Sequence, residues 1–170
     1  VFDLDGVILE TIDCKTKAFR ELYSEYGEEI QNKIEDHHLR NGGISRFEKI
    51  KFYHKNFLNI NLSEDDFKSQ LSKFSQLVLT EVYNSKFVEN VEYFIKELSK
   101  KFVLVLSTGT PTEEAKKILN YKKIDNFFIN IFGSPDSKLS HLQGLFKYNQ
   151  YNKKLFFGDA LSDYEAAMKY

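Results

Sequence analysis

The sequence predicts an α/β fold in which a parallel sheet forms the core and a block of helices is inserted after the first strand. Residues 1–9, VFDLDGVIL, have the pattern of a short strand followed by a turn at Gly6. Residues 13–84 carry apolar side chains at helical spacing and show little strand pattern. After this block, continuous apolar runs alternate with amphipathic segments, as in parallel sheets that helices cover on both faces.

The inserted block divides into segments separated by glycine and polar residues. In chain order they are a helix over 13–26, a polar segment over 28–41, a helix over 44–54 and a helix over 63–84. Gly27 ends the first helix, and Gly42-Gly43 separates the polar segment from the next helix. Ser63 and the three acidic residues after it supply a cap and the negative charge that favour a helix start.

The remainder of the chain alternates between helix and strand. The expected segments are a helix over 88–100, a strand over 102–106, a helix over 112–119, a strand over 128–132, a helix over 141–147, a strand over 154–157 and a helix from Ser162 onward. We therefore predict a core made of residues 1–12 plus 85–170 and a helical cap over 13–84, in a chain that is truncated at both ends.

Composition and charge exclude several classes of protein. The 170 residues carry a net charge of -1, without the basic stripe that nucleic-acid binding requires. The single cysteine rules out an internal disulfide framework, and no apolar run approaches the roughly 20 residues that span a bilayer. The expectation is a cytoplasmic protein with no nucleic-acid or membrane partner, and the sequence does not predict its oligomeric state.

Polar residues follow four predicted strands at their carboxyl ends, the edge of a parallel sheet where ligands bind. These residues are Asp3 and Asp5, Ser107 and Thr108, Lys138, and Asp159 and Asp163. Asp3 and Asp5, released from the strand by a glycine turn, can face one pocket. There one carboxylate can attack phosphorus, while the other protonates the leaving oxygen and later activates water.

The other three positions suit the binding of a phosphate and a metal ion. Hydroxyls and free N–H groups around Ser107, before a helix that starts near Thr112, suit a phosphate. Lys138 can neutralise a phosphoryl group and a carboxylate held against it, and carboxylates four residues apart form a hard-oxygen site for Mg²⁺. Taken singly, each feature also has an ordinary explanation as a turn, a helix cap or a solvated lysine.

In combination and in order, these motifs resemble the haloacid dehalogenase-like (HAD) superfamily. The similarity is to its phosphatase branch with a helical cap after the first strand, as in phosphoglycolate phosphatases and β-phosphoglucomutases. FDLDGVILET resembles the first motif of the family, LVLSTGT the second and FFGDALSDYEAA the fourth, and Lys138 falls at the lysine of the third. The resemblance covers nearly the whole chain and implies a Rossmann-like core.

The resemblance also implies roles for individual residues. Asp3 would be the nucleophile and Asp5 the general acid and base. The phosphate-binding residues would be Ser107, Thr108 and Lys138. Mg²⁺ would be held by the Asp3 carboxylate, the Asp5 main-chain carbonyl and Asp159, with Asp163 close by or in a second layer of contacts.

The implied function is Mg²⁺-dependent cleavage of a small phosphorylated metabolite through an aspartyl-phosphate. The substrate would be a sugar phosphate or a phosphoglycolate-like ester. Asp5 favours phosphate chemistry over dehalogenation, because an alkoxide leaving group benefits from an acid and a halide does not. The alternatives are a phosphosugar mutase of the same family and a non-catalytic module that binds a phosphorylated ligand.

The cap is expected to supply substrate specificity. Gly42-Gly43 permits a tight turn between helices, and the polar residues around it could face an anionic or hydroxylated substrate. These are Arg40, Asn41, Ser45, Arg46 and Lys49, of which Arg40, Asn41 and Arg46 are the candidate substrate contacts. His37 and His38 lack companions at metal-binding spacing and are expected to be surface histidines.

Overall fold

The computed structural model describes residues 1–147 and 153–169, so Tyr170 at the end of the last expected helix lies outside the described residues. The elements are α1 (Ile12–Leu22), η1 (Ser24–Tyr26), α2 (Glu28–Arg40), α3 (Arg46–Asn56), α4 (Glu64–Asn84), α5 (Val91–Ser99), β1 (Leu104–Pro111), α6 (Thr112–Tyr121), η2 (Asp125–Phe127), β2 (Phe128–Ser134), α7 (Lys138–Phe146) and α8 (Leu161–Met168). None of the described helices combines the length and the hydropathy needed to cross a bilayer.

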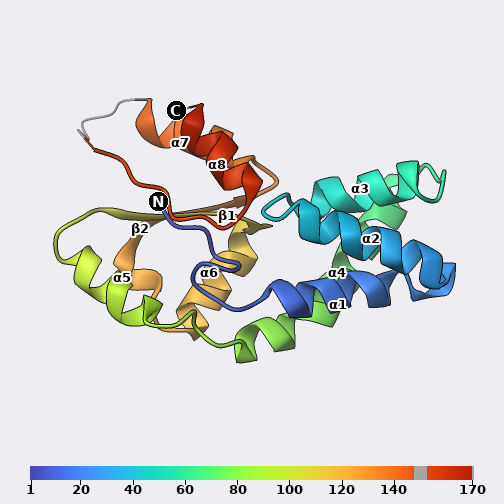
Figure 1. Cartoon of the computed structure of the whole chain (residues 1–170), viewed down its shortest axis with the longest axis horizontal. Coiled ribbons are helices and arrows are strands. Elements are labelled where there is room, and N and C mark those ends of the chain that lie inside the picture. The colour runs from blue at the N-terminus through green and yellow to red at the C-terminus, as the bar shows by residue number, and fades with distance from the viewer. Residues whose placement is uncertain (148–152, 170) are drawn as a thin grey trace.

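The predicted α/β class with a parallel sheet is confirmed. Strands β1 and β2 pair in parallel, with Leu106 opposite Ile131 in the register. Helices α5 and α6 lie on one side of the sheet, and α7 and α8 lie on the other (Figure 1). This arrangement gives the three layers expected when strands and helices alternate.

Two predicted strands are reduced to short pairing segments. Residues 1–9 and 154–157 form no continuous strand but join the sheet through isolated parallel bridges of Phe2 to Leu106 and to Phe157. The first segment leaves the sheet early because the chain turns at Gly6, whose φ is +76°. The Phe2 segment nevertheless lies between β1 and the segment at Phe157, so both acidic motifs end at the same sheet edge.

Other elements also differ from the prediction in their bounds or type. The strand expected over 102–106 runs over Leu104–Pro111, so the hydroxyl-rich motif lies within β1 and not in a turn after it. The helix expected at 141–147 begins at Lys138, because the Ser137 hydroxyl accepts the Ser140 N–H and caps it. The polar segment over 28–41 is helix α2, with glutamates in its first turn and basic residues in its last turn.

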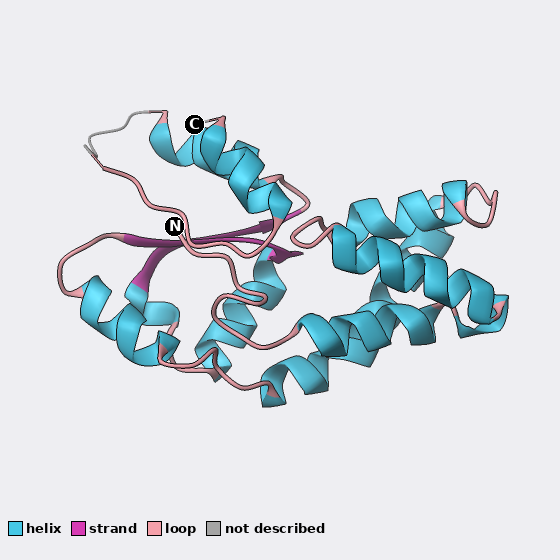
Figure 2. Cartoon of the chain, in the orientation of Figure 1, coloured by secondary structure: helices cyan, strands magenta, loops and turns pink. Residues whose placement is uncertain are grey.

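Helices α1–α4 form a bundle beside the sheet (Figure 2). Aromatic side chains fill its centre: the ring of Phe19 on α1 lies 4.3 Å from that of Phe74 on α4 and 5.6 Å from that of Tyr53 on α3. All three side chains are buried. The bundle therefore has an apolar centre of its own, built from the helical spacing visible in the sequence.

The bundle contacts the sheet and the helices that cover it through several residues. The guanidinium of Arg46 on α3 binds both carboxylate oxygens of Glu114 on α6, at 2.7 and 3.0 Å. The loop between α2 and α3 reaches the end of β1, where a Cβ on Gly109 would lie 2.7 Å from the Gly43 carbonyl oxygen. The Ser162 hydroxyl also donates to the Gly42 carbonyl at 3.0 Å. These contacts place the glycine turn directly over the carboxyl end of the sheet.

Candidate active site

Asp3 lies at the carboxyl end of its pairing segment and is 1% exposed. Its Oδ1 accepts the N–H of Leu4 at 2.7 Å, and its Oδ2 accepts a hydrogen bond from Lys138 Nζ at 2.7 Å. Burial raises the pKa of Asp3 to about 7, the Lys138 ammonium opposes this rise, and Asp163 and Asp5 add to it. Both oxygens of the predicted nucleophile are thus held in a fixed orientation.

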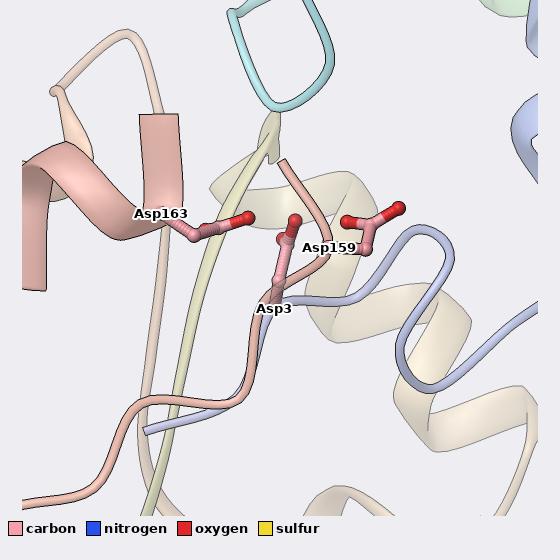
Figure 3. A group of neighbouring side chains, drawn as sticks. All are labelled: Asp3, Asp159 and Asp163. Carbon is pink, nitrogen blue, oxygen red and sulfur yellow. The ribbon is translucent and has the colours of Figure 1, made fainter. Parts of the chain in front are cut away.

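Three carboxylates meet at this edge of the sheet. Oxygen atoms of Asp3, Asp159 and Asp163 lie within 4.8 Å of one another, and the Asp3 carboxylate stands between the other two (Figure 3). Burial, followed by the charge of Asp163, raises the pKa of Asp159. Oxygen ligands at such spacing suit a hard divalent cation, which would remove the repulsion among these carboxylates. The donor set therefore fits a bound metal ion of that type.

Lys138 joins this cluster from the first turn of α7. Its Nζ donates to Asp3 and, at 2.5 Å, to Oδ1 of Asp163 on α8. The ammonium is buried, which by itself would lower its pKa, but the two carboxylates raise the pKa of Lys138 above its ordinary value. Asp163 also accepts the N–H of Ala160, which fixes the start of α8. The predicted lysine and the predicted metal-binding carboxylates are brought together.

The side chain of Asp5 points to a different set of partners. Its Oδ1 accepts a hydrogen bond from the Thr11 hydroxyl at 2.5 Å, and its Oδ2 accepts hydrogen bonds from Lys15 Nζ at 2.5 Å and from the Thr110 hydroxyl at 3.2 Å. Burial would raise the pKa of Asp5, but the Lys15 ammonium and these hydrogen bonds lower it to about 2. Asp5 is consequently a carboxylate at neutral pH, and its side chain stands outside the three-carboxylate cluster.

Ser107 lines neither of the two cavities described below. Its hydroxyl is fully buried and lies 2.9 Å from Nδ1 of His141 on α7. His141 Nε2 lies 3.2 Å from the Gly133 carbonyl, which can only accept, so Nε2 carries the proton and Ser107 donates to Nδ1. The sequence reasoning did not single out His141. The sequence around His141 showed only the apolar spacing of a helix, and this spacing does not predict a hydrogen bond to a serine.

Thr108 faces a cavity of about 250 Å³ that Lys138, Gly43 and Gly109 also line. A second cavity, of about 440 Å³, lies between Asp5 and Asp159 of the core and side chains of the bundle. Gly43, Ile44 and Gly109 line both cavities, so the glycine turn separates them. Gly43 has a φ of +73°, and a Cβ there would lie 2.8 Å from Lys138 Nζ. Glycine at this position therefore allows the turn to approach the lysine.

The candidate substrate contacts of the bundle lie in different settings. Arg40 is exposed beside Asp36 at 3.7 Å, and the Asn41 amide donates to the His37 carbonyl of its own helix. Arg46 is buried and bound to Glu114. Arg40 and Arg46 line the larger cavity, whereas Asn41 is not among its lining residues.

The histidines of α2 differ from the surface positions expected for them. His38 is buried against the Phe19 ring, with centroids 4.9 Å apart, and its Nδ1 lies 2.9 Å from Lys49 Nζ. His37 is half-buried and stacks on Phe52. The expectation failed because α2 places both rings toward α1 and α3, a packing relationship that residue spacing in the polar segment did not indicate.

Comparisons with known proteins bear on this geometry. The sequence profile of the family described as "Haloacid dehalogenase-like hydrolase" matches residues 1–170. A curated relative from Thermotoga maritima, named "Phosphorylated carbohydrates phosphatase", is 29% identical over 176 residues, which cover 98% of this chain and 78% of the relative.

Solved structures share the fold. One, from Haemophilus somnus, is described as a "predicted phosphoglycolate phosphatase"; it has a TM-score of 0.71 and 22% identity and covers 99% of this chain and 79% of its own. A β-phosphoglucomutase from Clostridium difficile has a TM-score of 0.61 and 25% identity, over 76% of this chain and 58% of its own. These similarities agree with a Rossmann-like α/β arrangement.

Proposed function

Because the chain belongs to the haloacid dehalogenase-like hydrolase family, we propose that it is a phosphatase that cleaves a small phosphorylated carbohydrate or a phosphoglycolate-like ester. The membership confirms the family predicted from the sequence, and the predicted enzyme class, a HAD-like phosphatase, agrees with the printed name of the Thermotoga relative. The observation that carries the proposal is the Asp3–Lys138–Asp163 arrangement at the carboxyl end of the sheet.

Asp3 is the proposed nucleophile. Its carboxylate oxygen attacks phosphorus, the ester oxygen leaves, and an aspartyl-phosphate forms on Asp3. Lys138 lies against the same carboxylate and offsets the charge of the incoming phosphoryl group. Thr108 lines the cavity beside Lys138 and is the proposed hydroxyl contact to this group. Ser107, the neighbour of Thr108 in β1, holds this part of the strand against α7 through its hydrogen bond to His141.

Asp5 is the proposed general acid and base. It gives a proton to the leaving oxygen and then takes one from the water that hydrolyses the aspartyl-phosphate. The resting carboxylate, paired with Lys15, is already in the form that activates water. Donation to the leaving group requires Asp5 to hold a proton, so its pairing with Lys15 must weaken when a substrate enters.

A divalent metal ion is the proposed cofactor, and Mg²⁺ is the proposed identity. Asp3 and Asp159 would hold the ion together with the main-chain carbonyl of Asp5, and Asp163 stands beside them. When bound, the ion supplies positive charge that reduces the repulsion between the carboxylates and an anionic substrate. Oxygen donors and a site of net negative charge favour Mg²⁺ over softer metals.

The helical block over residues 13–84 is the proposed cap, and residues 1–12 plus 85–170 are the proposed core. The cap would cover the site and select the substrate, since the core motifs contact only the phosphoryl group and the metal. The position of the glycine turn supports this cap role, because Gly43 lines both cavities next to the acidic cluster.

A phosphatase screen tests the proposal. The wild type and Asp3→Asn are compared on sugar phosphates, phosphoglycolate and nucleotides, with Mg²⁺ or with a chelator. We expect phosphate release that requires Mg²⁺ and that Asp3→Asn abolishes. Absence of release by folded wild-type protein on every ester would reject the phosphatase.

A phosphosugar mutase is the second candidate, supported by the likeness to the β-phosphoglucomutase structure. The two activities differ in the acceptor of the phosphoryl group, which is water in a phosphatase and a sugar hydroxyl in a mutase. Incubation with a sugar monophosphate and catalytic sugar bisphosphate, followed by ³¹P NMR, distinguishes isomerised sugar phosphate from inorganic phosphate.

A further inference from the structure

Lys49 on α3 is a buried cation without an acidic partner. Lys49 is 2% exposed. Among the described residues, no carboxylate lies within 4.0 Å of its Nζ. The partners of Nζ are Nδ1 of His38 at 2.9 Å and the His38 carbonyl oxygen at 3.4 Å. A buried ammonium with only neutral partners is unfavourable, because desolvation is not offset by an opposite charge.

The imidazole of His38 does not supply that charge. Burial and the nearby Lys49 lower the pKa of His38 to about 3, so the ring is neutral at physiological pH. Burial, followed by the charge of Lys15, lowers the pKa of Lys49 to about 7, and the more distant charge of Asp5 only partly opposes this fall. Nδ1 of His38 therefore accepts a hydrogen bond from Lys49 and orients it without neutralising it.

The other cations around the larger cavity already have acidic partners. Lys15 binds Asp5, and Arg46 binds Glu114 through two hydrogen bonds. Arg40 is exposed and lies near Asp36. Lys49 thus differs from the other cationic residues that line this cavity, because an anion that entered would be its first ion-pair partner.

The cavity connects this lysine to the reaction site. Lys49 and His38 line it from the cap side, and Asp5 and Asp159 line it from the core side. Its volume of about 440 Å³ is in the range of small-molecule sites. A substrate whose phosphoryl group lies at Asp3 would extend from the core residues toward Lys49.

We propose that Lys49 binds a second anionic group of the substrate, a carboxylate or a further phosphate, while the phosphoryl ester is cleaved at Asp3. This inference rests on the proposed phosphatase function and narrows its substrate class to esters with two separate anionic groups. His38 acts as a positioning residue, since it holds the Lys49 amine through its ring nitrogen and its carbonyl. Such substrates are preferred because their second anionic group supplies the negative charge that the buried Lys49 ammonium lacks as a partner.

Matched pairs of esters test this assignment. Phosphoglycolate and ethyl phosphate differ by a carboxylate in place of a methyl group, and glucose 1,6-bisphosphate and glucose 1-phosphate differ by a second phosphate. We expect the wild type to favour the doubly anionic member of at least one pair in kcat/KM. Lys49→Met should reduce that preference about 10- to 100-fold, as expected for losing a charged hydrogen bond. The pair that responds identifies the second group as carboxylate or phosphate.

Two further variants control the result. Lys49→Gln keeps a hydrogen-bond donor but loses the charge, and should reduce the same preference. Lys55→Met changes an exposed lysine on the same helix and should leave the preference as in the wild type. Equal losses on both members of each pair in Lys49→Met, or no preference in the wild type, would overturn the proposal.

A binding measurement separates this inference from the catalytic proposal. Asp3→Asn protein, alone and combined with Lys49→Met, is titrated calorimetrically with all four esters. Weaker binding of only the doubly anionic esters in the double variant supports Lys49 even if no ester is hydrolysed, and equal binding by both proteins overturns it. Failure of the wild type to hydrolyse any of the esters would count against the phosphatase and not against the Lys49 contact.

Discussion

The Nζ atom of Lys138 lies 2.7 Å from Oδ2 of Asp3, although 135 positions separate the two residues in the chain. The same ammonium contacts Asp163, so one cation serves two carboxylates, and Asp159 completes the acidic cluster. Burial, followed by the charges of Asp163 and Asp5, raises the pKa of Asp3, and the cluster as a whole carries an excess of negative charge. A divalent cation would correct it, with consequences for stability as well as for activity.

The first prediction concerns Mg²⁺ and thermal stability. An acid whose folded-state pKa is raised from 3.8 to about 7 destabilises the fold as pH rises through that window, because the unfolded state releases the proton more readily. A Mg²⁺ ion bound at the cluster would take the place of that proton. We expect saturating Mg²⁺ to raise Tm by roughly 5 °C at pH 8, and by less at pH 5 where protons compete. Differential scanning calorimetry measures both values.

Two variants make this test specific. Asp163→Asn should weaken the Mg²⁺-dependent rise in Tm, whereas Asp65→Asn, on the exposed first turn of α4, should retain it. A rise of equal size in both variants would place the ion elsewhere on the protein.

The second prediction concerns Lys15 and the protonation of Asp5. Replacing Lys15 with methionine removes the cation that lowers the pKa of Asp5, so this pKa should rise from about 2. The acid limb of kcat should then appear at a higher pH than in the wild type, because less Asp5 is available as the base that activates water for hydrolysis of the aspartyl-phosphate. Steady-state rates from pH 4 to 8 at saturating Mg²⁺ measure the shift. Lys17→Met, an exposed change on the same helix, should leave the profile in place.

The third prediction concerns the ion pair that links the bundle to α6. Buried Arg46 and partly buried Glu114 form an ion pair, and removing one partner leaves the other charged and poorly solvated. Arg46→Met should lower the free energy of unfolding by about 3–5 kcal/mol, and the double variant Arg46→Met/Glu114→Leu should recover part of that loss. Urea denaturation measures each variant. Lys33→Met, which breaks an exposed pair, serves as the control, and strict additivity of the two changes would show that the pair is not coupled.

The sequence predicted the order of the elements because apolar spacing and strand length are local properties. It predicted less well where long-range pairing decides the outcome. Phe2 has the apolar character of a strand residue, but its segment forms only bridges since the turn at Gly6 follows so soon. The end of β1 moved to Pro111 because pairing with β2 continues to Ser134, which the sequence of β1 alone does not reveal.

The candidate site divides along the same line. Asp3, Lys138 and Asp163 were recognisable because they follow strands that must end at one edge, and they do meet. The roles of Ser107 and Arg46 could not be read in this way, because their partners, His141 and Glu114, come from helices whose facing depends on tertiary packing. The sequence therefore did not show which residues these long or hydroxylated side chains contact, and the structure was needed to identify them.

The last prediction concerns the energetic cost of Lys49. Its folded-state pKa is lowered from 10.5 to about 7, so between these values the unfolded state binds the proton more tightly. Wild-type stability should therefore rise as pH increases from 7 to 10, with an upper limit of about 4–5 kcal/mol for this single group. Lys49→Met lacks this dependence, although it leaves Nδ1 of His38 without its donor, which costs about 1–3 kcal/mol.

Urea denaturation at pH 7 and pH 10 separates these two effects. The free energy of unfolding of Lys49→Met relative to wild type should be more favourable at pH 7 than at pH 10, whatever its absolute sign. Lys55→Met is exposed and should show no such change between the two pH values. The difference in the free energy of unfolding between Lys49→Met and wild type could instead stay constant with pH. This result would mean that a negative charge within the folded protein already keeps the pKa of Lys49 near its ordinary value. In that case the Lys49 ammonium would already have a partner of opposite charge and would gain little from a second anionic group of the substrate.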